Sequence, residues 1–511
     1  INPANGVELC RCPLSNADDV AQAIAIGKEV FQEWKSTTIK QRTSIMLKFY
    51  SLVNQHAQEL AEIIVRENGK NITEALADVA KGNETVEWAC SLPQLAPGRL
   101  LEVSRGIECC EYRDPLGVVA CIVPFNFPVM VPMWTFPIAL VMGNCVILKP
   151  SEKVPSAMQR IVELLAEAGL PAGVMQLVHG GQEVVKALTD APVTDIAAVS
   201  FVGSSKVASI VFDRCNTLKK RVIALGGAKN HLIATPDCDI GMASRDIVAS
   251  FAGCSGQRCM AASVLLLTSS PTDGPNEHAK LDELLSEIIR IARDLKPGQN
   301  SGQVGPVIDT IAVNRILSYI DEAVTKDGAE ILLDGRTGWS ESTTGNWIGP
   351  TILLHRNSND RAMREEIFGP VLSVYRASSW NEAITIENSN PYGNAACIYT
   401  EKGAVADWFT TQFRAAMLGV NIGIPVPREP FSFGGLYGTD SKYGNNDITG
   451  DGAMEFFSSR RKVTRKWTSS YATNSVSSNT GSLSTSSSSS SNSIKKSRIE
   501  TNDAASFDGK M

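Results

Sequence analysis

The segment around Cys259 carries the clearest chemical signal in the chain. It reads Gly256-Gln257-Arg258-Cys259-Met260-Ala261 and lies between a stretch of small residues and the apolar run 264–267. This setting predicts a thiol at the mouth of a strand, directly preceded by a cationic side chain. A neighbouring arginine favours the nucleophilic thiolate form of a cysteine. The alternative is a buried structural cysteine, which is the commoner interpretation of a cysteine considered alone.

Asn126 is a second candidate for chemistry. It lies in Pro124-Phe125-Asn126-Phe127-Pro128, a rigid turn that would hold its amide in largely apolar surroundings. A fixed amide N–H close to an attacking thiolate could stabilise an oxyanion. The alternative is an asparagine that serves only its own turn.

Two further segments indicate contacts with a nucleotide. Lys149 and Glu152 directly follow an apolar strand, at the edge of a sheet where open α/β folds bind ligands. Such a Lys could donate to ribose hydroxyls, and such a Glu could accept from a 2′-hydroxyl and repel a 2′-phosphate. The turn 203–205, Gly-Ser-Ser, opens a helix whose backbone N–H groups could face a pyrophosphate. The alternatives are a solvated pair at a helix start and a plain strand-to-helix connection, since no GxGxxG fingerprint is present.

Composition narrows the class of protein. A length of 511 residues predicts two or three domains, and a net charge of -6 gives no reason to expect nucleic acid or an anionic membrane as partner. The longest apolar stretch, 127–146, is interrupted by prolines and is interpreted as buried core. The 12 cysteines are scattered, which suits a reducing compartment, and no zinc spacing or HExxH motif appears, so no metal site is expected.

The elements that must position these residues follow an α/β pattern. Helices are predicted over 15–34, capped by Ser15 with Asp18, and over 41–53. From residue 116 onward, short apolar strands alternate with helices, which predicts βαβ units and a mostly parallel sheet. The same alternation over 264–418 predicts a second α/β domain. The serine-rich segment 468–511 is predicted to be disordered, because it has too little apolar surface to offset its ordering entropy.

Seven motifs together resemble one family. PFNFP, ILKPSE, FVGSS, LGGAKNH, GQRCMA, EEIFGPV and NPYGN occur in the order and spacing of the NAD(P)-dependent aldehyde dehydrogenase superfamily, over approximately residues 1–467. GQRCM, AKNH and the segment 424–433 resemble its CoA-acylating methylmalonate-semialdehyde dehydrogenase branch. The resemblance implies two α/β domains with Rossmann-like parallel sheets and a small β oligomerisation element. The implied parts are an NAD-binding domain (1–104 and 124–226), a catalytic domain (227–425) and the oligomerisation element (105–123 and 453–467).

The resemblance also implies roles for individual residues. Cys259 matches the nucleophile and Asn126 the oxyanion donor, while Arg258 matches a residue that holds the substrate carboxylate. Lys81 stands where the branch has a second arginine. It keeps the positive charge but lacks the planar guanidinium that binds a carboxylate through two N–H groups. Lys149 and Glu152 match contacts to the adenosine ribose, Ser204 a contact to the pyrophosphate, and Glu366 with Phe368 the nicotinamide side. The full set implied for the cofactor is Phe125, Lys149, Glu152, Lys153, Ser204, Glu366 and Phe368.

Ala224 marks the informative departure from the hydrolytic members of the superfamily. They carry Glu there to activate water, whereas the CoA-dependent branch also lacks it. A thioester on Cys259 needs a general base for hydrolysis but much less help to pass its acyl group to another thiol. The resemblance therefore predicts NAD-dependent oxidation of malonate or methylmalonate semialdehyde, with CoA as co-substrate. The products would be acetyl-CoA or propionyl-CoA, CO2 or bicarbonate, and NADH.

Two alternatives to this function stay open. One is a hydrolytic NAD-dependent aldehyde dehydrogenase, and the other is a weakly active paralogue with a binding role, suggested by Lys81 and by the altered stretch 434–451. The resemblance further implies a homotetramer, a mitochondrial setting and a part in valine and thymine catabolism. No targeting peptide is visible in the chain, which begins at Ile1.

Overall fold

The computed structural model describes residues 1–269, 275–342 and 344–466. The predicted disordered segment 468–511 lies outside the described residues. The chain divides into two compact units, one made of Ile1–Arg99 and Glu111–Lys462 and the other of Leu100–Cys110 and Val463–Met511. The first unit holds both α/β sheets and every candidate site residue.

The first unit begins with helices, as the sequence predicted. They are α1 (Ala17–Ser36), α2 (Ile39–Gln55), α3 (Ala57–Asn68), α4 (Ile72–Ala89) and α5 (Leu92–Leu95). The predicted cap of α1 is wrong by one residue: Asn16 caps the helix in a capping box with Asp19. Ser15 is not the cap because its backbone N–H donates to the carbonyl of His179, at 2.7 Å.

A six-stranded sheet follows in the order β15-β7-β6-β3-β4-β5. Its strands are β3 (Val118–Ile122), β4 (Cys145–Lys149), β5 (Met175–Leu177), β6 (Ala198–Val202), β7 (Arg221–Leu225) and β15 (Lys442–Tyr443). The five strands from β7 to β5 are parallel, and β15 runs antiparallel to β7. Strand order reverses between β3 and β6, so the carboxyl ends there form the crevice where open α/β sheets bind ligands.

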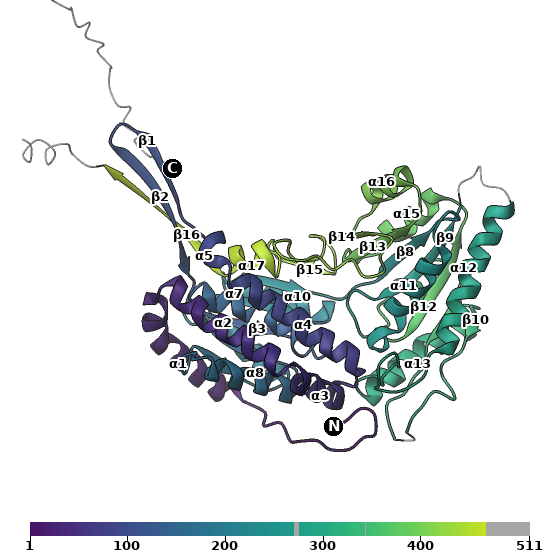
Figure 1. The fold of residues 1–511 in the computed structure, drawn as a ribbon, viewed down its shortest axis with the longest axis horizontal. Helices are drawn as coiled ribbons and strands as arrows, with labels where there is room; N and C mark the ends of the chain where they lie inside the picture. Colours follow the sequence, from purple (N-terminus) through teal and green to yellow (C-terminus); the bar gives the residue numbers. More distant parts are fainter. Residues whose placement is uncertain (270–274, 343, 467–511) are drawn as a thin grey trace, which may run out of the picture. The chain divides into compact units, whose positions relative to one another are not determined.

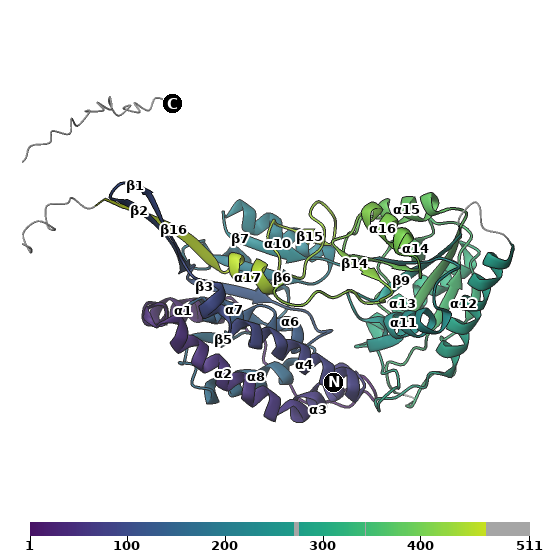
Figure 2. The same cartoon turned by 45° about the horizontal axis from the view of Figure 1, so that its top comes forward.

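The helices associated with this sheet are α6 (Met130–Met133), α7 (Phe136–Val141), α8 (Pro155–Glu167), α9 (Gln182–Asp190) and α10 (Ser205–Thr217). Figures 1 and 2 show α1, α2, α3 and α8 grouped beside the sheet. Residues 105–123 were assigned above to the oligomerisation element, but 118–122 form β3 inside this sheet. Their continuous apolar run explains the difference, because it is buried on both faces of a parallel sheet.

A seven-stranded sheet lies further along the chain, in the order β10-β11-β12-β9-β8-β13-β14. Its strands are β8 (Asn230–Ala234), β9 (Ala262–Thr268), β10 (Glu330–Leu333), β11 (Thr351–Leu354), β12 (Val371–Ala377), β13 (Ala395–Tyr399) and β14 (Met417–Val420). All neighbours are parallel except β10, which runs antiparallel to β11.

The remaining helices are α11 (Ile240–Ala252), the 3-10 turn Gly253–Gly256, α12 (Pro275–Asp294), α13 (Thr310–Thr325), α14 (Arg361–Arg364), α15 (Trp380–Asn388), α16 (Gly403–Gln412) and α17 (Gly450–Phe456). The chain thus belongs to the predicted α/β class, with two mainly parallel sheets. No helix among the described residues combines the length and apolar character that crossing a membrane requires.

The second unit contains parts of three strands, namely residues 100–104, 107–110 and 463–466. The strands β1 (Arg99–Ser104), β2 (Ile107–Pro115) and β16 (Ser458–Lys466) form a three-stranded sheet in the order β1-β2-β16. Within the unit, Arg465 Nη1 pairs with Glu108 Oε1 at 3.3 Å. Leu100, Leu101 and Val103 are exposed on β1.

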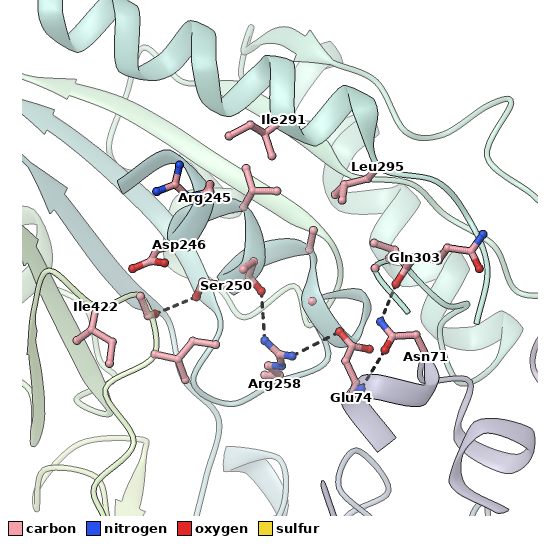
Figure 3. A pocket seen from close by; sticks show the side chains of 18 residues that line it. Asn71, Glu74, Arg245, Asp246, Ser250, Arg258, Ile291, Leu295, Gln303 and Ile422 are labelled. Carbon is pink, nitrogen blue, oxygen red and sulfur yellow. Dashed lines mark hydrogen bonds and ion pairs between the residues drawn. The ribbon is translucent and has the colours of Figure 1, made fainter. Parts of the chain in front are cut away.

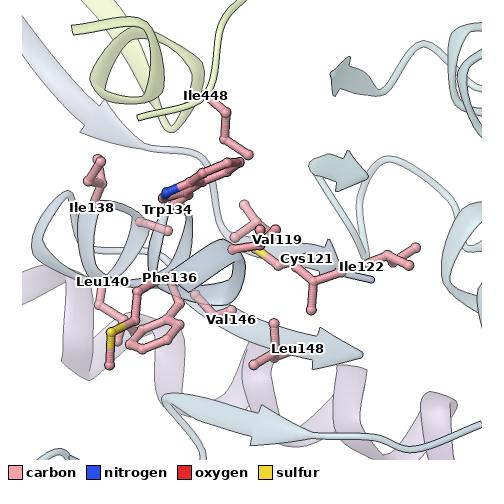
Figure 4. Close-up of a cluster of buried hydrophobic side chains, with 14 of the residues drawn as sticks. Val119, Cys121, Ile122, Trp134, Phe136, Ile138, Leu140, Val146, Leu148 and Ile448 are labelled. Atoms are coloured by element: carbon pink, nitrogen blue, oxygen red, sulfur yellow. The ribbon is translucent and has the colours of Figure 1, made fainter. Parts of the chain in front are cut away.

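The core of the first sheet is built from the segment that the sequence marked as buried. Figure 4 shows Val119 and Cys121 of β3 beside Val146 and Leu148 of β4, with Phe136 of α7 packed among them. All of these side chains are fully buried. The prolines and the glycine that exclude a membrane span instead divide 127–146 into two short helices and a strand.

Asn144 fastens this core together although it is polar and fully buried. Its Oδ1 accepts from the backbone N–H of Leu116 at 2.7 Å and of Gly117 at 3.3 Å. Its Nδ2 donates to the carbonyls of Ala139 at 3.0 Å and Phe457 at 2.8 Å. One side chain therefore satisfies four backbone groups from three separate segments.

We predict that Asn144→Ala lowers the free energy of unfolding by roughly 3 kcal/mol or more, because it leaves buried N–H and C=O groups without partners. The midpoint of guanidinium denaturation measures this effect. Asn216→Ala, an exposed change on α10, is the matched control and should stay within about 0.5 kcal/mol. Equal midpoints for the two variants would contradict the role assigned to Asn144.

Candidate active site

Cys259 lies in a connection with an unusual backbone. Helix α11 ends at Ala252, and the residues that follow lead through Cys259 to strand β9. Three successive residues, Cys254, Ser255 and Gly256, have left-handed φ angles of 49°, 55° and 69°. A left-handed residue other than glycine costs about 1 kcal/mol or more, so this turn exists only because its surroundings impose it. We call residues 254–259 the nucleophile loop.

Side chains and backbone from other elements hold the left-handed part of the loop. Glu74 Oε1, on α4, accepts from the N–H of Cys254 at 2.6 Å. Ser255 Oγ donates to the carbonyl of Gly305 at 2.6 Å. Gly256 has to be glycine, since a Cβ there would come within 2.0 Å of the carbonyl oxygen of Gly369.

Asn126 reaches the same loop from the carboxyl end of β3. Its buried side chain donates from Nδ2 to the carbonyl of Gln257 at 3.0 Å. Gln257 Oε1 in turn accepts from the N–H of Ile308 at 3.1 Å. The structure therefore places Asn126 beside the nucleophile loop, with one of its two amide N–H groups engaged there.

The carbonyl of Cys259 itself receives two side-chain amides that the sequence analysis missed. Asn230 Nδ2 donates to it at 2.8 Å and Asn394 Nδ2 at 3.0 Å. Asn230 begins β8, which pairs with β9, and Asn394 precedes β13, the neighbour of β8 on its other side. An available signal was that both asparagines stand at the start of apolar strands inside the motifs LGGAKNH and NPYGN. They fix the backbone that carries the thiol.

The thiol of Cys259 does not have the low pKa that its neighbour suggested. Burial, with a smaller contribution from the charge of Glu366, raises its pKa to about 12. Backbone N–H groups and Arg258 act in the opposite direction but more weakly. Arg258 lowers the pKa of Cys259, as expected from the sequence. The expected low pKa is nevertheless wrong, because burial raises the pKa by more than one cation lowers it.

Glu366 lies close to the nucleophile loop and to the glycines after β7. Its Oε1 accepts from the N–H of Ala228 at 3.0 Å. A Cβ on Gly227 would come within 2.3 Å of its Oε2, so glycine is needed for this approach. Burial raises the pKa of Glu366 to about 7, whereas burial lowers the pKa of the nearby Lys229 to about 7. The two groups influence each other, and each favours the charged form of the other.

Aromatic side chains accompany this carboxylate. Phe368, two residues after Glu366, has a left-handed φ of 54°. Its ring meets that of Phe125 edge to face, with centroids 6.1 Å apart. Lys153 Nζ lies 5.5 Å from the centroid of the Phe125 ring and pairs with Asp309 Oδ2 at 2.6 Å. Phe125, Lys153, Glu366 and Phe368 thus cluster on one side of the nucleophile loop.

The residues expected to contact a nucleotide lie at the carboxyl edge of the six-stranded sheet. Lys149 ends β4, is buried, and pairs with Glu152 Oε2 at 3.2 Å. Ser204 is the N-cap of α10, but its side chain makes no capping hydrogen bond. The adjacent Ser205 Oγ accepts from the N–H of Gly227 at 2.9 Å. This bond ties the start of α10 to the glycine that Glu366 approaches.

A cavity of about 630 Å³ opens at the nucleophile loop on the α4 side. Its wall brings together Cys259, Arg258 and Lys81, three residues that the sequence analysis assigned to chemistry or substrate binding. Trp134 and Phe433, with ring centroids 4.5 Å apart, also line it. We call this space the substrate cavity.

Lys81 lines the cavity together with a second cation, Arg428, which the sequence did not suggest. Lys81 Nζ pairs with Glu84 Oε1 at 2.7 Å, and Arg428 Nη1 pairs with the other oxygen of Glu84. Both cations and Phe433 line the cavity. The N–H of Phe433 donates to the carbonyl of Ile448 at 2.8 Å, and the N–H of Ile448 donates to the carbonyl of Phe433 at 2.9 Å. The altered stretch 434–451 is therefore anchored at the cavity wall.

Ala224 lies in the interior at the end of β7. It is fully buried, and it belongs to the same hydrophobic cluster as Met260, against which Cys259 packs. Its backbone is paired on both sides, with Phe201 of β6 and Tyr443 of β15. A methyl group thus occupies the position where the resemblance expects a carboxylate in hydrolytic enzymes.

Comparison with known proteins matches this arrangement to one family. The model of the Aldehyde dehydrogenase family matches residues 1–463. The chain belongs to the aldehyde dehydrogenase family. No group of three or more His, Cys, Asp or Glu side chains that could hold a metal ion occurs within residues 1–269, 275–342 and 344–466.

Relatives within the family share most of their length with this chain. It is 41% identical over 470 residues to malonate-semialdehyde dehydrogenase 1 of Oceanobacillus iheyensis, covering 91% of this chain and 94% of the relative. It is 40% identical over 470 residues, with the same coverage, to malonate-semialdehyde dehydrogenase 1 of Geobacillus thermodenitrificans. Both organisms are bacteria, which argues against the mitochondrial setting expected from the sequence.

Two solved structures are similar along the whole described fold. Methylmalonate-semialdehyde dehydrogenase of Oceanimonas doudoroffii superposes with a TM-score of 0.87 at 38% identity, covering 92% of this chain and 95% of that one. A candidate methylmalonate-semialdehyde dehydrogenase of Sinorhizobium meliloti, solved in complex with NAD, gives 0.86 at 36% identity, with 92% and 94% covered. These matches confirm the aldehyde dehydrogenase fold that the motifs suggested.

We predict that alkylation of Cys259 by iodoacetamide is slow at pH 7 and rises about tenfold per pH unit up to pH 9, because only the thiolate reacts. Glu366→Gln should speed the reaction at pH 8, since losing the carboxylate charge lowers the pKa of Cys259. Mass spectrometry of the Cys259 peptide separates it from the other thiols. Glu365→Gln, which removes the adjacent and exposed carboxylate, is the control; a plateau below pH 8 would show that the thiol is acidic.

Proposed function

We propose that this protein is an NAD-dependent, CoA-acylating dehydrogenase of malonate semialdehyde or methylmalonate semialdehyde. The names of the two bacterial relatives and of the Oceanimonas structure support the substrate class. The NAD in the Sinorhizobium complex supports the cofactor. The observation that carries the proposal is that Ala224, a buried residue with only a methyl side chain, belongs to the hydrophobic cluster against which Cys259 packs.

The residues at the carboxyl edge of the six-stranded sheet fit NAD. Lys149 and Glu152 stand together at the end of β4, where they would bind the hydroxyls of the adenosine ribose. The carboxylate of Glu152 would repel a 2′-phosphate, which favours NAD over its phosphorylated form. Ser204 and the first N–H groups of α10 would meet the pyrophosphate. We assign this sheet to the NAD-binding domain and the seven-stranded sheet to the catalytic domain.

The nicotinamide side would be formed by the cluster that contains Phe125, Glu366 and Phe368. Glu366 would accept from the hydroxyls of the nicotinamide ribose, and Phe368 would line the ring. When bound, NAD supplies a hydride acceptor next to Cys259. Its positively charged ring would also favour the thiolate, offsetting the burial that raises the pKa of Cys259.

Cys259 would attack the aldehyde carbon and form an S–C bond, placing negative charge on the former carbonyl oxygen. Asn126 Nδ2 engages the Gln257 carbonyl through one N–H, which leaves the second for this oxyanion. Arg258 would hold the carboxylate of the semialdehyde in the same cavity, with Lys81 and Arg428 adding positive charge. Loss of hydride from the tetrahedral adduct leaves a thioester on Cys259.

The fate of the thioester separates the candidate functions. With a methyl group at Ala224, that position offers no base to activate water, so a thiol would attack more readily than water. CoA would then take the acyl group, and its thiol proton would pass to the Cys259 sulfur. The C–C bond to the carboxylate would break to release CO2 or, after hydration, bicarbonate, and a proton would take its place on the remaining carbon. Glu366, with a pKa raised to about 7, is the one observation that favours the hydrolytic alternative, because it could serve as a base.

We predict that steady-state NADH formation from malonate semialdehyde depends on CoA. Omitting CoA should lower the rate at least tenfold after the first turnover, since the thioester lacks a base for hydrolysis. Absorbance at the NADH band measures the rate, and chromatography identifies acetyl-CoA. Equal turnover with and without CoA would instead establish the hydrolytic enzyme, and no NADH with any semialdehyde would favour the weakly active paralogue.

Arg258→Ala should lower kcat/KM for malonate semialdehyde by roughly 10- to 100-fold, the range for losing a hydrogen bond to a charged group. Propanal has no carboxylate, so its kcat/KM should change much less. Arg245→Ala, which removes an arginine that lines a neighbouring cavity but not the substrate cavity, is the control. An equal loss with both aldehydes would contradict the carboxylate role of Arg258.

A further inference from the structure

Arg258 already has partners within the protein. Its Nη1 donates to the carbonyl of Ala249 at 3.2 Å, and its Nη2 lies 3.5 Å from Glu74 Oε1. Figure 3 shows Glu74 reaching from α4 to the guanidinium. The two side chains are only 18% and 15% exposed, so water screens their interaction much less than that of a surface pair.

Glu74 is itself incompletely satisfied. Its Oε1 accepts the short 2.6 Å hydrogen bond from the N–H of Cys254. Its Oε2 is buried and has no hydrogen-bond partner in the part of the chain that the structure describes. Burying a carboxylate oxygen without a partner is costly, so such an atom in a cavity wall needs an explanation.

The pair lies where two cavities meet. Glu74 and Arg258 line the substrate cavity and also a neighbouring cavity of about 540 Å³. Asn71, Arg245 and Gln303 are polar residues of that second cavity, labelled in Figure 3. A carboxylate that binds the guanidinium from the substrate cavity would therefore come close to the carboxylate of Glu74.

Asp78 is better compensated by charge than Glu74, and Glu429 makes a hydrogen bond outside the Arg258 pair. Asp78 accepts from Lys70 Nζ at 2.6 Å and from the N–H of Met130 at 2.7 Å. Glu429 Oε1 accepts from the hydroxyl of Thr85 at 2.8 Å. Within the described residues, the cation paired with Glu74 is Arg258, at the long distance of 3.5 Å, so the negative charge of Glu74 acts most directly on a ligand at that guanidinium.

We propose that Glu74 is a specificity-determining residue: an internal counter-ion that occupies Arg258 in the empty enzyme and competes with the carboxylate of the semialdehyde. This inference rests on the proposed function, since it assumes that Arg258 binds that carboxylate. Glu74 keeps the buried guanidinium charge-balanced and positioned before substrate arrives. The same charge weakens the retention of any carboxylate, so the cavity takes acidic semialdehydes without holding them tightly.

Glu74→Gln tests this directly, because the amide oxygen of Gln can still accept from the N–H of Cys254 while the charge is lost. The KM for malonate semialdehyde should fall roughly tenfold relative to the KM for propanal. The inhibition constant of malonate, a dicarboxylate without an aldehyde, should fall by a similar factor when propanal is the substrate. Glu74→Asp keeps the charge and should bring neither gain.

Glu87→Gln is the matched control, an exposed carboxylate on the same helix, and should leave both ratios unchanged. Unchanged or weaker malonate binding in Glu74→Gln would overturn the proposal, as would equal tightening in Glu74→Asp. Failure of the proposed function looks different: the wild-type protein would oxidise propanal but not malonate semialdehyde. The malonate inhibition constants would still decide the role of Glu74 in that case.

Discussion

The left-handed turn at Cys254, Ser255 and Gly256 is the constraint on which the site depends. It is intrinsically unfavourable, and it persists because Glu74, Gly305 and Gly369 surround it from three separate segments. Further along the loop, Asn126 holds the carbonyl of Gln257, and Asn230 and Asn394 hold that of Cys259. Hydrogen bonds from residues of both sheets thereby fix the backbone that carries the nucleophile.

Charge balance around this loop follows from the same burial. Glu366 and Lys229 form one pair of opposite charges near Cys259, and Glu74 and Arg258 form another. Burial and the charge of Glu366 together outweigh Arg258, which favours the protonated thiol. A cationic nicotinamide ring would reverse that balance, so the thiolate would form where a hydride acceptor is present. Reactivity of the sulfur would thus be coupled to occupation of the cofactor site.

Much of the fold and part of the site could be predicted from the sequence. The apolar runs 118–122 and 145–149 are strands, as the pattern from residue 116 onward predicted, because buried parallel strands are almost purely apolar. Cys259, Asn126 and Arg258 could be named from local motifs. Asn230 and Asn394 lie inside two of these motifs but were missed, and Glu74 and Arg428 could not be named, because their roles come from contacts between segments far apart in the chain. The elevated pKa of Cys259 was missed for the same reason, since adjacent Arg258 is visible in the sequence whereas burial is not.

The central claim is that water hydrolyses the thioester on Cys259 only slowly, because the position of Ala224 offers no base. The most direct measurement mixes enzyme, NAD and malonate semialdehyde without CoA, quenches the mixture at short times, and determines the mass of the Cys259 peptide. The account predicts that acylated Cys259 accumulates to nearly one equivalent per active site, matching the first burst of NADH, and disappears when CoA is added. Continued NADH formation with Cys259 unmodified at every time would contradict it.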